Sequence, residues 1–557
     1  MHHYILIPVL YITFFLNLIN SSQTFTSGKG KNSVTSKKSV LMAHRIKNIH
    51  INNYFNLKEI EHRPDELEKF YSNRNYKLAW FEYGRLGKNA SDFISELKNA
   101  PAEGFPDSYY ESLPVSRAIT EMKNNPGFLK FFPYKIVQSD ILLTQTYLEY
   151  ASELSSGLIK PQELEIIWEI HPSEQNLVDT LEEAIENQNI AESFQKLKPE
   201  NPQYRFLISV HQKLQEQKLN GGWPEPGQFS TLEEKDSSEN VVKIKKYLLA
   251  TGDLSYEDSI YLKNQNYDSR LAEAVENFQS RHGLEEDGVV GKNTLREMNQ
   301  PIDYRLNQIR INLDRLRWES KNQHNTYIVI NIPDYSLKLF KNGKMAQQMN
   351  VVVGEFENYT PALKDSISYI VINPTWKVPW SIATKEMLPK IKADPDYLAR
   401  NNFSLRRGSY NGEKVATPNN VNWSEITKTN FPFFIVQEPG NFNSLGRIKF
   451  LLPNNHSIYL HDTPASHLFN RAQRDFSHGC IRLEKPFKLA EKLLEGQVTP
   501  AKIREKLISR ETETIVLDEK VPVHIHYHTA WVDSAGEMQF RNDVYEFDKI
   551  SLTALPK

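Results

Sequence analysis

Cys480 is the only cysteine among the 557 residues, so it has no partner for an internal disulfide. It lies in Phe476-Ser-His-Gly-Cys-Ile-Arg482, and His461 lies upstream in Tyr459-Leu-His-Asp-Thr-Pro464, far enough away for a separate strand to return it to the sulfur. A thiolate and an imidazole are the minimum equipment for acyl transfer through a thioester. Most free cysteines are small buried hydrophobic residues. The Ser-His-Gly-Cys setting nevertheless favours Cys480 as a nucleophile and His461 as its base.

The residues around Cys480 suggest supporting roles. His478 shares its face in an extended chain and would support the loop or the thiolate. Gly479 permits close backbone approach, and the N–H groups around Gly479 and Cys480 are natural oxyanion donors. Arg482 would bind a substrate carboxylate or favour the thiolate, or it forms a structural ion pair. Asp462 follows His461 and points to the opposite face of a strand, so a backbone carbonyl is the better candidate to orient the imidazole.

Two groups of histidines raise the question of a metal site. The first is spread around Cys480 and lacks the helical His-Glu-x-x-His spacing of a zinc enzyme, so we expect no metal there: His461, Asp462, His467, Asp475 and His478. The second alternates in Val521–Trp531, which places three imidazoles on one strand face: His524, His526 and His528. A metal there is conceivable. We predict an exposed strand face instead, because no carboxylate or cysteine completes the set.

His-Asp-Thr-Pro followed by Ser-His-Gly-Cys-Ile-Arg-Leu resembles the active-site signature of L,D-transpeptidases, the cysteine enzymes that cross-link peptidoglycan. The resemblance implies that the cysteine attacks the L,D-amide after the third residue of a donor tetrapeptide stem and releases D-alanine. The side-chain amine of a diamino acid on a neighbouring stem then resolves the thioester into a 3→3 cross-link. No metal or organic cofactor is implied. We assign Tyr459, Ser477 and Trp376, which lie in matching motifs, to substrate binding.

Two other functions remain open. An L,D-carboxypeptidase would release the same thioester to water. A non-catalytic wall-binding protein would need neither Cys480 nor His461, and their presence argues against it. The acidic and basic residues nearly cancel, at 69 and 67, so the net charge of −2 gives no electrostatic case for a nucleic-acid partner.

The first residues suggest export. Residues 1–22 are predicted to be a signal peptide or N-terminal anchor, because the apolar stretch Tyr4–Ile19 is shorter than the roughly 20 residues of a membrane helix. Residues 23–52 are rich in Ser, Thr, Gly and Lys and predict a disordered tether. We therefore expect a periplasmic protein that is soluble or tethered to the inner membrane, with no other membrane contact.

The length suggests three or four domains. Residues 53–237 are predicted to be helical and resemble the scaffold domain of large Gram-negative L,D-transpeptidases. One helix is expected to end at Gly157, since apolar residues before it recur at helical spacing: Val137, Ile141, Thr144, Leu148 and Ala151.

Residues 238–300 predict a compact three-helix unit. Phe278-Gln279, Gly283-Leu284 and Asp287-Gly-Val-Val-Gly291 match, in order, the peptidoglycan-binding domain 1 family. The unit either binds glycan or serves as a spacer. Asn293 or Thr294 is expected to cap its last helix. A connecting helix follows in 301–323, and its arginines are expected on the solvated side: Arg305, Arg310, Arg315 and Arg317.

From residue 324 the hydrophobic period changes from 3.6 to 2. Asn342-Gly343 predicts a tight hairpin. Residues 324–510 are expected to form a mainly-β catalytic domain with a capping insertion at about 380–430, and 511–557 a C-terminal strand region that packs on it. The predicted fold class is thus multidomain α+β: a helical scaffold, a small peptidoglycan-binding-like domain and a mainly-β L,D-transpeptidase domain.

Overall fold

The computed structural model describes residues 40–42, 63–83, 85–124, 133–172, 174–255, 259–319, 324–394 and 396–555. The predicted signal segment, 1–22, lies outside these residues. In the predicted tether, residues 40–42 are helical and Met42 is buried, which differs from the disorder expected for that stretch. No helix in the described ranges combines the length and apolarity that crossing a membrane requires.

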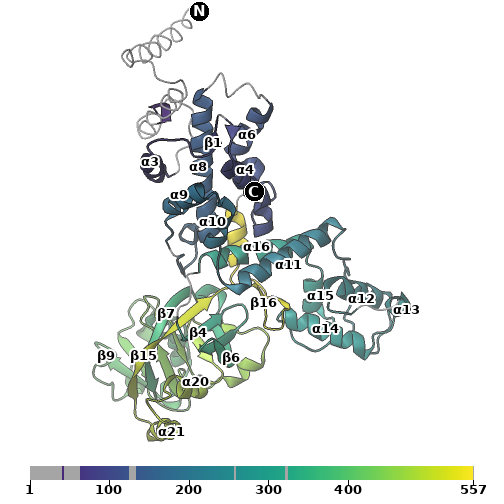
Figure 1. The fold of residues 1–557 in the computed structure, drawn as a ribbon. Coiled ribbons are helices and arrows are strands. Elements are labelled where there is room, and N and C mark those ends of the chain that lie inside the picture. The colour runs from purple at the N-terminus through teal and green to yellow at the C-terminus, as the bar shows by residue number, and fades with distance from the viewer. Residues whose placement is uncertain are drawn as a thin grey trace, which may run out of the picture. The chain divides into compact units, whose positions relative to one another are not determined.

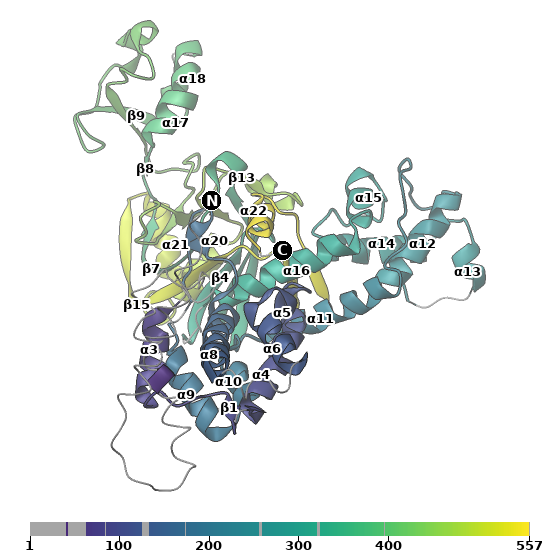
Figure 2. The ribbon, with the colours of Figure 1, turned by 90° about the horizontal axis from the view of Figure 1, so that it is seen from above.

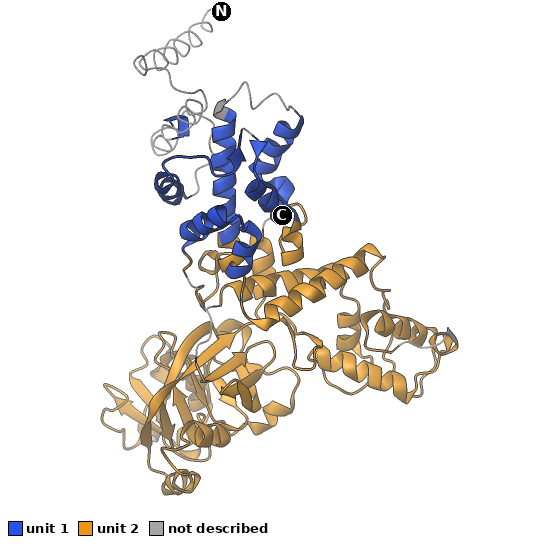
Figure 3. Ribbon diagram, in the orientation of Figure 1, with its two compact units in different colours: residues 1–98, 109–151, 176–196 blue, residues 99–108, 152–175, 197–557 orange. Residues whose placement is uncertain are grey.

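The chain forms two compact units (Figure 3). One contains residues 1–98, 109–151 and 176–196, and the other contains 99–108, 152–175 and 197–557. Residues 197–237, which the sequence assigns to the helical scaffold, group with the C-terminal part of the chain. The long helix α11 (Pro202–Leu219) explains this grouping, since its buried residues Tyr204, Leu207 and Leu214 pack with α16 (Ile302–Arg317).

The first unit is helical around aromatic residues. Trp80 stacks on Phe93, and Phe93 stacks on Phe194. The buried Asp140 carboxylate accepts hydrogen bonds from the Ala79 and Trp80 N–H groups. The predicted helix before Gly157 is confirmed as α8. The elements are α3 (Pro64–Asn73), β1 (Phe81–Glu82), β2 (Arg85–Leu86), α4 (Lys88–Asn99), α5 (Tyr109–Ser112), α6 (Pro114–Asn124), α8 (Pro133–Ser156), α9 (Leu177–Asn187) and α10 (Ile190–Leu197).

Helix α16 is buried on nearly every side, and the prediction that its arginines face solvent is wrong. Arg305 pairs with Glu297 at 2.8 Å and Arg315 with Asp548 at 2.6 Å. Arg317 donates to the Glu103 carbonyl and pairs with Asp314. An acidic partner offsets part of the cost of burying each guanidinium, although the buried Nε and Nη2 of Arg315 and Nε of Arg317 make no hydrogen bond in the described structure.

The described residues of the module, 239–255 and 259–298, form four helices (Figure 1): α12 (Glu239–Thr251), α13 (Ser259–Lys263), α14 (Ser269–Arg281) and α15 (Lys292–Met298). Gln279 links the Phe278-Gln279 motif to the Asp287–Gly291 motif. Its side-chain amide donates to Asp287 Oδ1 and to Thr294 Oγ1 and accepts from the Gly288 N–H. The capping prediction is wrong: Gly291 is the N-cap of α15 and no side chain caps it.

The C-terminal part contains a ten-stranded sheet with the order β11-β12-β14-β6-β5-β4-β15-β7-β3, with β13 paired to β6. The sheet closes on itself because β11 pairs with both β12 and β7. Apolar residues of alternate positions fill its interior. The strands are β3 (Trp168–Glu169), β4 (Thr326–Asn331), β5 (Ser336–Lys341), β6 (Lys344–Gly354), β7 (Ala362–Ile372), β11 (Ile448–Leu451), β12 (Tyr459–His461), β13 (Asp475–Ser477), β14 (Ile481–Leu483) and β15 (Glu513–His526).

The predicted hairpin is confirmed between β5 and β6. Asn342 and Gly343 both have positive φ, +50° and +72°, as the two central residues of a type I′ hairpin turn require.

The capping insertion has its own core. A three-stranded sheet, ordered β8-β10-β9, packs with short helices around buried residues that include Leu405 and Ile435 (Figure 2). Its elements are β8 (Trp376–Lys377), α17 (Trp380–Ile382), a π-helical turn η4 (Ala383–Met387), α18 (Leu388–Ala393), α19 (Tyr397–Arg400), β9 (Phe403–Arg407) and β10 (Phe433–Gln437). The insertion thus reaches beyond the predicted 380–430, because β8 and β10 pair outside that range.

The C-terminal region is more than a strand segment packed on the sheet. Strand β15 is a member of the closed sheet, between β4 and β7. Asp543–Tyr545, expected near a strand, forms a turn before α22 (Phe547–Ala554). The other elements are α20 (Pro486–Leu493), α21 (Pro500–Ser509), β16 (Ala530–Val532) and β17 (Met538–Phe540). The predicted class, multidomain α+β with a mainly-β C-terminal domain, is confirmed.

Candidate active site

Cys480 lies in the short turn that joins β13 to β14. Strand β14 runs parallel to β12, with Leu460 opposite Ile481 and His461 opposite Arg482. The sequence-predicted residues His461, Cys480 and Arg482 therefore come together because two short strands pair side by side. The thiol is half-buried, and its Sγ lies 3.6 Å from the Ser457 carbonyl oxygen.

The turn is held by hydrogen bonds of Ser477. The buried Ser477 Oγ donates to the Cys480 carbonyl at 2.5 Å and accepts from the Gly479 N–H at 3.2 Å. These contacts involve two residues with predicted roles, and those roles stay predictions. Ser477 Oγ is occupied within the turn, and the Gly479 N–H already has an acceptor there. In the described part of the chain, the Cys480 N–H has no acceptor.

Gly479 must be a glycine for two reasons. Its φ of +103° lies in the left-handed region, and a Cβ added to it would lie 3.3 Å from Ile458 Cδ1. Its carbonyl accepts from Thr360 Oγ1 at 2.7 Å. Tyr545, from the C-terminal turn, donates to the Gly354 carbonyl at 2.6 Å. A residue almost at the end of the chain therefore supports the backbone beside Cys480.

His461 is buried, and its Nδ1 lies 2.5 Å from its neighbour's backbone carbonyl, that of Asp462. A backbone carbonyl thus orients the imidazole, as the sequence predicts. The Asp462 carboxylate instead accepts from the Arg447 and Thr463 N–H groups, and so fixes the loop that carries the carbonyl. Burial, with a smaller contribution from the charge of Arg482, lowers the pKa of His461 to about 3. The imidazole is neutral near pH 7, and with Nδ1–H on the carbonyl its Nε2 can accept a proton.

Positive charge surrounds the thiol. Lys449 Nζ lies 3.6 Å from the centroid of the Tyr459 ring, and the Tyr459 side chain interacts with the Cys480 thiol. Burial raises the pKa of the Cys480 thiol, while Tyr459, Lys449 and Arg482 oppose that rise. Desolvation is the largest of these effects, so the resting thiol is protonated at neutral pH. Arg482 is half-buried, and within the described ranges no carboxylate pairs with it.

The other two predicted residues belong to the capping insertion or touch it. His478 is exposed, and its Nε2 lies 2.8 Å from Glu386 Oε1 of η4. Trp376 lies in β8, opposite Gln437 of β10, and its ring is 6.2 Å from that of Phe403. The structure therefore brings His478 near the cap, and Trp376 takes part in the packing of the cap.

Sequence reasoning missed Lys449, Thr360, Tyr545 and Glu386. Lys449 could have been found, because it alternates with the apolar Ile448 and Phe450 and so points away from the core. It stands opposite His461 in the pairing of β11 with β12. The others reach the site only through tertiary contacts.

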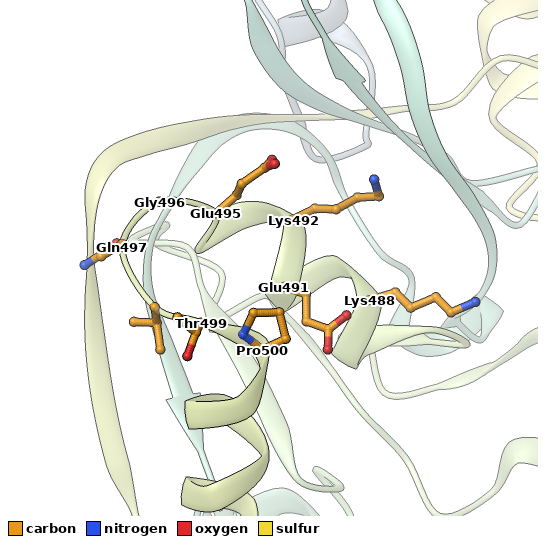
Figure 4. Close-up of a pocket in the computed structure, with 9 residues that line it drawn as sticks. Lys488, Glu491, Lys492, Glu495, Gly496, Gln497, Thr499 and Pro500 are labelled. Atoms are coloured by element: carbon orange, nitrogen blue, oxygen red, sulfur yellow. The ribbon is translucent and has the colours of Figure 1, made fainter.

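A cavity of about 580 Å³ lies at the turn between α20 and α21 (Figure 4). It contains none of the candidate site residues. Lysine and glutamate side chains from α20 and the turn after it line this cavity: Lys488, Glu491, Lys492 and Glu495. These long charged side chains border a solvated groove. Cys480 and its neighbours therefore remain the candidate active site.

Comparisons with known proteins match three parts of the chain to domain families. Residues 325–503 match the L,D-transpeptidase catalytic domain family, 237–298 the family "Putative peptidoglycan binding domain", and 65–209 the scaffold domain family. A protein of Haemophilus influenzae named "Putative L,D-transpeptidase" is 35% identical over 223 residues, which is 40% of this chain. The match spans 44% of that relative's length.

Solved structures with weaker similarity include an L,D-transpeptidase from Mycobacterium smegmatis, at 12% identity and TM-score 0.17, covering 36% of this chain and 58% of that one. Another is an L,D-transpeptidase from Xylanimonas cellulosilytica, at 13% identity and TM-score 0.16, covering 54% of this chain and 100% of that one. Scores of this size carry no weight beyond the family matches.

Proposed function

From the premise that residues 325–503 belong to the L,D-transpeptidase catalytic domain family, we propose that the protein forms 3→3 cross-links between peptidoglycan stem peptides through a Cys480 thioester. The observation that carries the proposal is the pairing of β12 with β14. It places the only thiol of the chain beside a neutral, carbonyl-oriented imidazole and two cations.

In the first half-reaction, Cys480 Sγ attacks the carbonyl of the L,D-amide in the donor stem. The thiol proton passes to His461 Nε2 as the S–C bond forms. The oxyanion is stabilised by the Cys480 N–H, which has no acceptor among the described residues. The C–N bond then breaks, and His461 returns the proton to the leaving amine of D-alanine.

In the second half-reaction, the side-chain amine of a diamino acid on an acceptor stem attacks the thioester carbonyl. His461 takes a proton from this amine, and the S–C bond breaks to release Cys480. The thiolate recovers the proton from the imidazolium, so the enzyme returns to its neutral resting state.

The cations give the site a preference for anionic stems. Arg482 and Lys449 lie beside the thiol and carry positive charge in a half-buried setting. A carboxylate of the stem peptide would form a charge-assisted hydrogen bond with Arg482. Tyr459, whose side chain interacts with the thiol, would shape the same surface.

Incubation of the purified protein with disaccharide-tetrapeptide tests the proposal. We expect cross-linked dimers and free D-alanine in the mass spectrum, and neither product with Cys480→Ala. Tripeptide without dimers would identify an L,D-carboxypeptidase. Binding to purified cell walls without either product would identify a wall-binding protein, and full cross-linking by Cys480→Ala would overturn the mechanism.

We also propose that the protein is exported to the periplasm and that residues 237–298 bind the glycan or space the catalytic domain from it. The first proposal is supported by the composition of residues 1–22, and the second by the family match. Cell fractionation and sedimentation of the full chain with purified cell walls test them in turn.

A further inference from the structure

Three potential metal ligands converge where the chain leaves α16 and where β15 ends. They are Glu319, His526 and His528, and their ligand atoms all lie within 4.8 Å of one another. Among the described residues, no other group of three or more histidine, cysteine, aspartate or glutamate side chains is arranged in this way. The prediction of an exposed histidine face is therefore wrong. The carboxylate that the sequence seemed to lack comes from Glu319, far away in the chain.

One oxygen stands between the two imidazoles. Glu319 Oε1 lies 2.7 Å from His528 Nε2 and 2.7 Å from His526 Nδ1. The side chains of His526 and Glu319 are only 8% and 14% exposed. The contact to His528 has hydrogen-bond geometry, whereas the buried Nδ1 of His526 makes no hydrogen bond in the described structure. A buried nitrogen that points at an oxygen without donating to it is unusual, because such groups are costly to leave unsatisfied.

The three side chains come from firmly placed backbone. His526 ends β15 and pairs with Asn331 of β4. The Asn331 side chain accepts from the His528 N–H at 2.8 Å and donates to the His528 carbonyl at 2.9 Å. Glu319 comes directly after the last turn of α16, where Trp318 is fully buried. The imidazole rings of His526 and His528 are nearly parallel, with an angle of 27° between their planes and centroids 5.2 Å apart. Such preorganisation is what a metal site needs.

We propose that Glu319, His526 and His528 bind one Zn²⁺ ion that ties the exit of α16 to the end of β15. Two imidazoles and a carboxylate are an established zinc ligand set, with water in the fourth position. The partial exposure of Glu319 and His528 leaves a path for the ion and the water. Zinc bonds of roughly 2.0–2.1 Å separate tetrahedral ligands by about 3.3 Å, so a small rotation of the carboxylate suffices. The ion would join residues 209 positions apart and stabilise the fold rather than take part in acyl transfer.

Nearby cations set the charge balance. Arg315 is adjacent but is neutralised by Asp548. Lys364 interacts with the Glu319 carboxylate and with His524 from the neighbouring strand β7. Neutral imidazoles and one carboxylate would leave the bound ion with a single net positive charge. A shared proton between Glu319 and the histidines is the competing occupant, and the experiment must separate it from zinc.

Zinc content of the full chain separates the two. The Cys480→Ala background keeps the only thiol from binding zinc. After removal of metal and equilibration with Zn²⁺, we expect one zinc per chain in this background. Glu319→Gln should lower zinc affinity by more than about 100-fold, the upper end of the cost of losing a second-shell partner. His524→Ala is the matched control, since its ring lies on the same strand face but outside the ligand set. It should retain the zinc.

Substoichiometric zinc in the background protein, zinc retained by Glu319→Gln, or an equal loss in His524→Ala would each overturn the proposal. If Glu319→Gln fails to fold by circular dichroism, Co²⁺ titration of the background protein decides. Intense visible bands of tetrahedral cobalt support the site, and their absence overturns it. Zinc should also raise the Tm of the background protein by roughly 5 °C or more. An unchanged Tm would contradict the stabilising role.

Discussion

The closed sheet carries two histidine sites with opposite arrangements. In β12 the Nδ1 of the buried His461 forms a hydrogen bond with a backbone carbonyl, and the cations Arg482 and Lys449 are nearby. At the end of β15 two imidazoles share a carboxylate. The comparison shows that a strand face by itself does not decide what a histidine does. A carbonyl partner leaves a neutral base for proton transfer, whereas a convergent carboxylate makes a ligand set for a cation.

The largest expected effect separates the two sites directly. His461→Gln should lower kcat/KM for cross-linking by about 10²–10⁴-fold, the usual contribution of a general base, and it should leave the zinc content unchanged. Glu319→Gln should do the reverse, with zinc lost and kcat/KM within about twofold of the parent when both are assayed at 25 °C. Kinetics with Cys480 present and metal analysis in the Cys480→Ala background check both.

A loss of activity in Glu319→Gln as large as that in His461→Gln would break the comparison, because the two sites would then act as one. Circular dichroism of both variants shows whether a general loss of structure causes such an effect. His467→Ala, a histidine in the Cys480 region for which we propose no role, serves as the control for histidine replacement near the thiol.

A second prediction concerns substrate charge at the thiol site. Arg482→Met should lower kcat/KM by about 10–100-fold, since a hydrogen bond to a charged group is worth about 1.5–3 kcal/mol. The change should appear mainly in KM if Arg482 binds a stem carboxylate equally in the ground and transition states. Steady-state kinetics with the stem peptide and with its amidated form check this. An equal loss for both substrates would rule out carboxylate recognition.

Local sequence patterns were sufficient where the deciding contacts are local. The Asn342-Gly343 turn, α8 and the cluster of His461, Cys480 and Arg482 follow from residue types, period and spacing. Alternation in β11 would also have identified Lys449. These features depend on neighbours within one or two elements, which a single sequence displays.

Patterns failed where distant partners decide the outcome. In the sequence, the arginines of α16 resemble the solvated face of a helix. In the structure they are buried, and they pair with acidic residues up to 233 positions away in the chain. Glu319 changes the meaning of the β15 histidines in the same manner. The Gly479 N–H donates to Ser477 Oγ, a contact that the sequence does not display, and its role as an oxyanion donor stays a prediction. A local pattern predicts that a polar residue is exposed, because the local sequence does not show the distant partner that would allow its burial.

A third prediction uses the raised pKa of the Cys480 thiol. Because burial favours the neutral thiol, its alkylation by iodoacetamide should increase with pH through a midpoint above that of a free cysteine. Lys449→Met removes a charge that favours the thiolate, so the rate at pH 8 should fall by about threefold to tenfold. Intact mass reports the reaction without ambiguity, since the chain has one thiol. Lys344→Met, on the exposed hairpin, is the control and should leave the rate unchanged.

The smallest expected effect tests whether His478 belongs with the catalytic histidine or with the cap. Its contact to Glu386 joins two side chains that are each 41% exposed, and exposed ion pairs contribute about 0.2–1 kcal/mol. If this contact is its role, His478→Ala and Glu386→Gln should each lower kcat/KM by less than about fivefold, and the double variant should lose no more than either single one. A loss near that of His461→Gln would instead place His478 in the proton-transfer machinery. Additive losses would show that the two residues act separately, so the ion pair would have no part in seating the cap over Cys480.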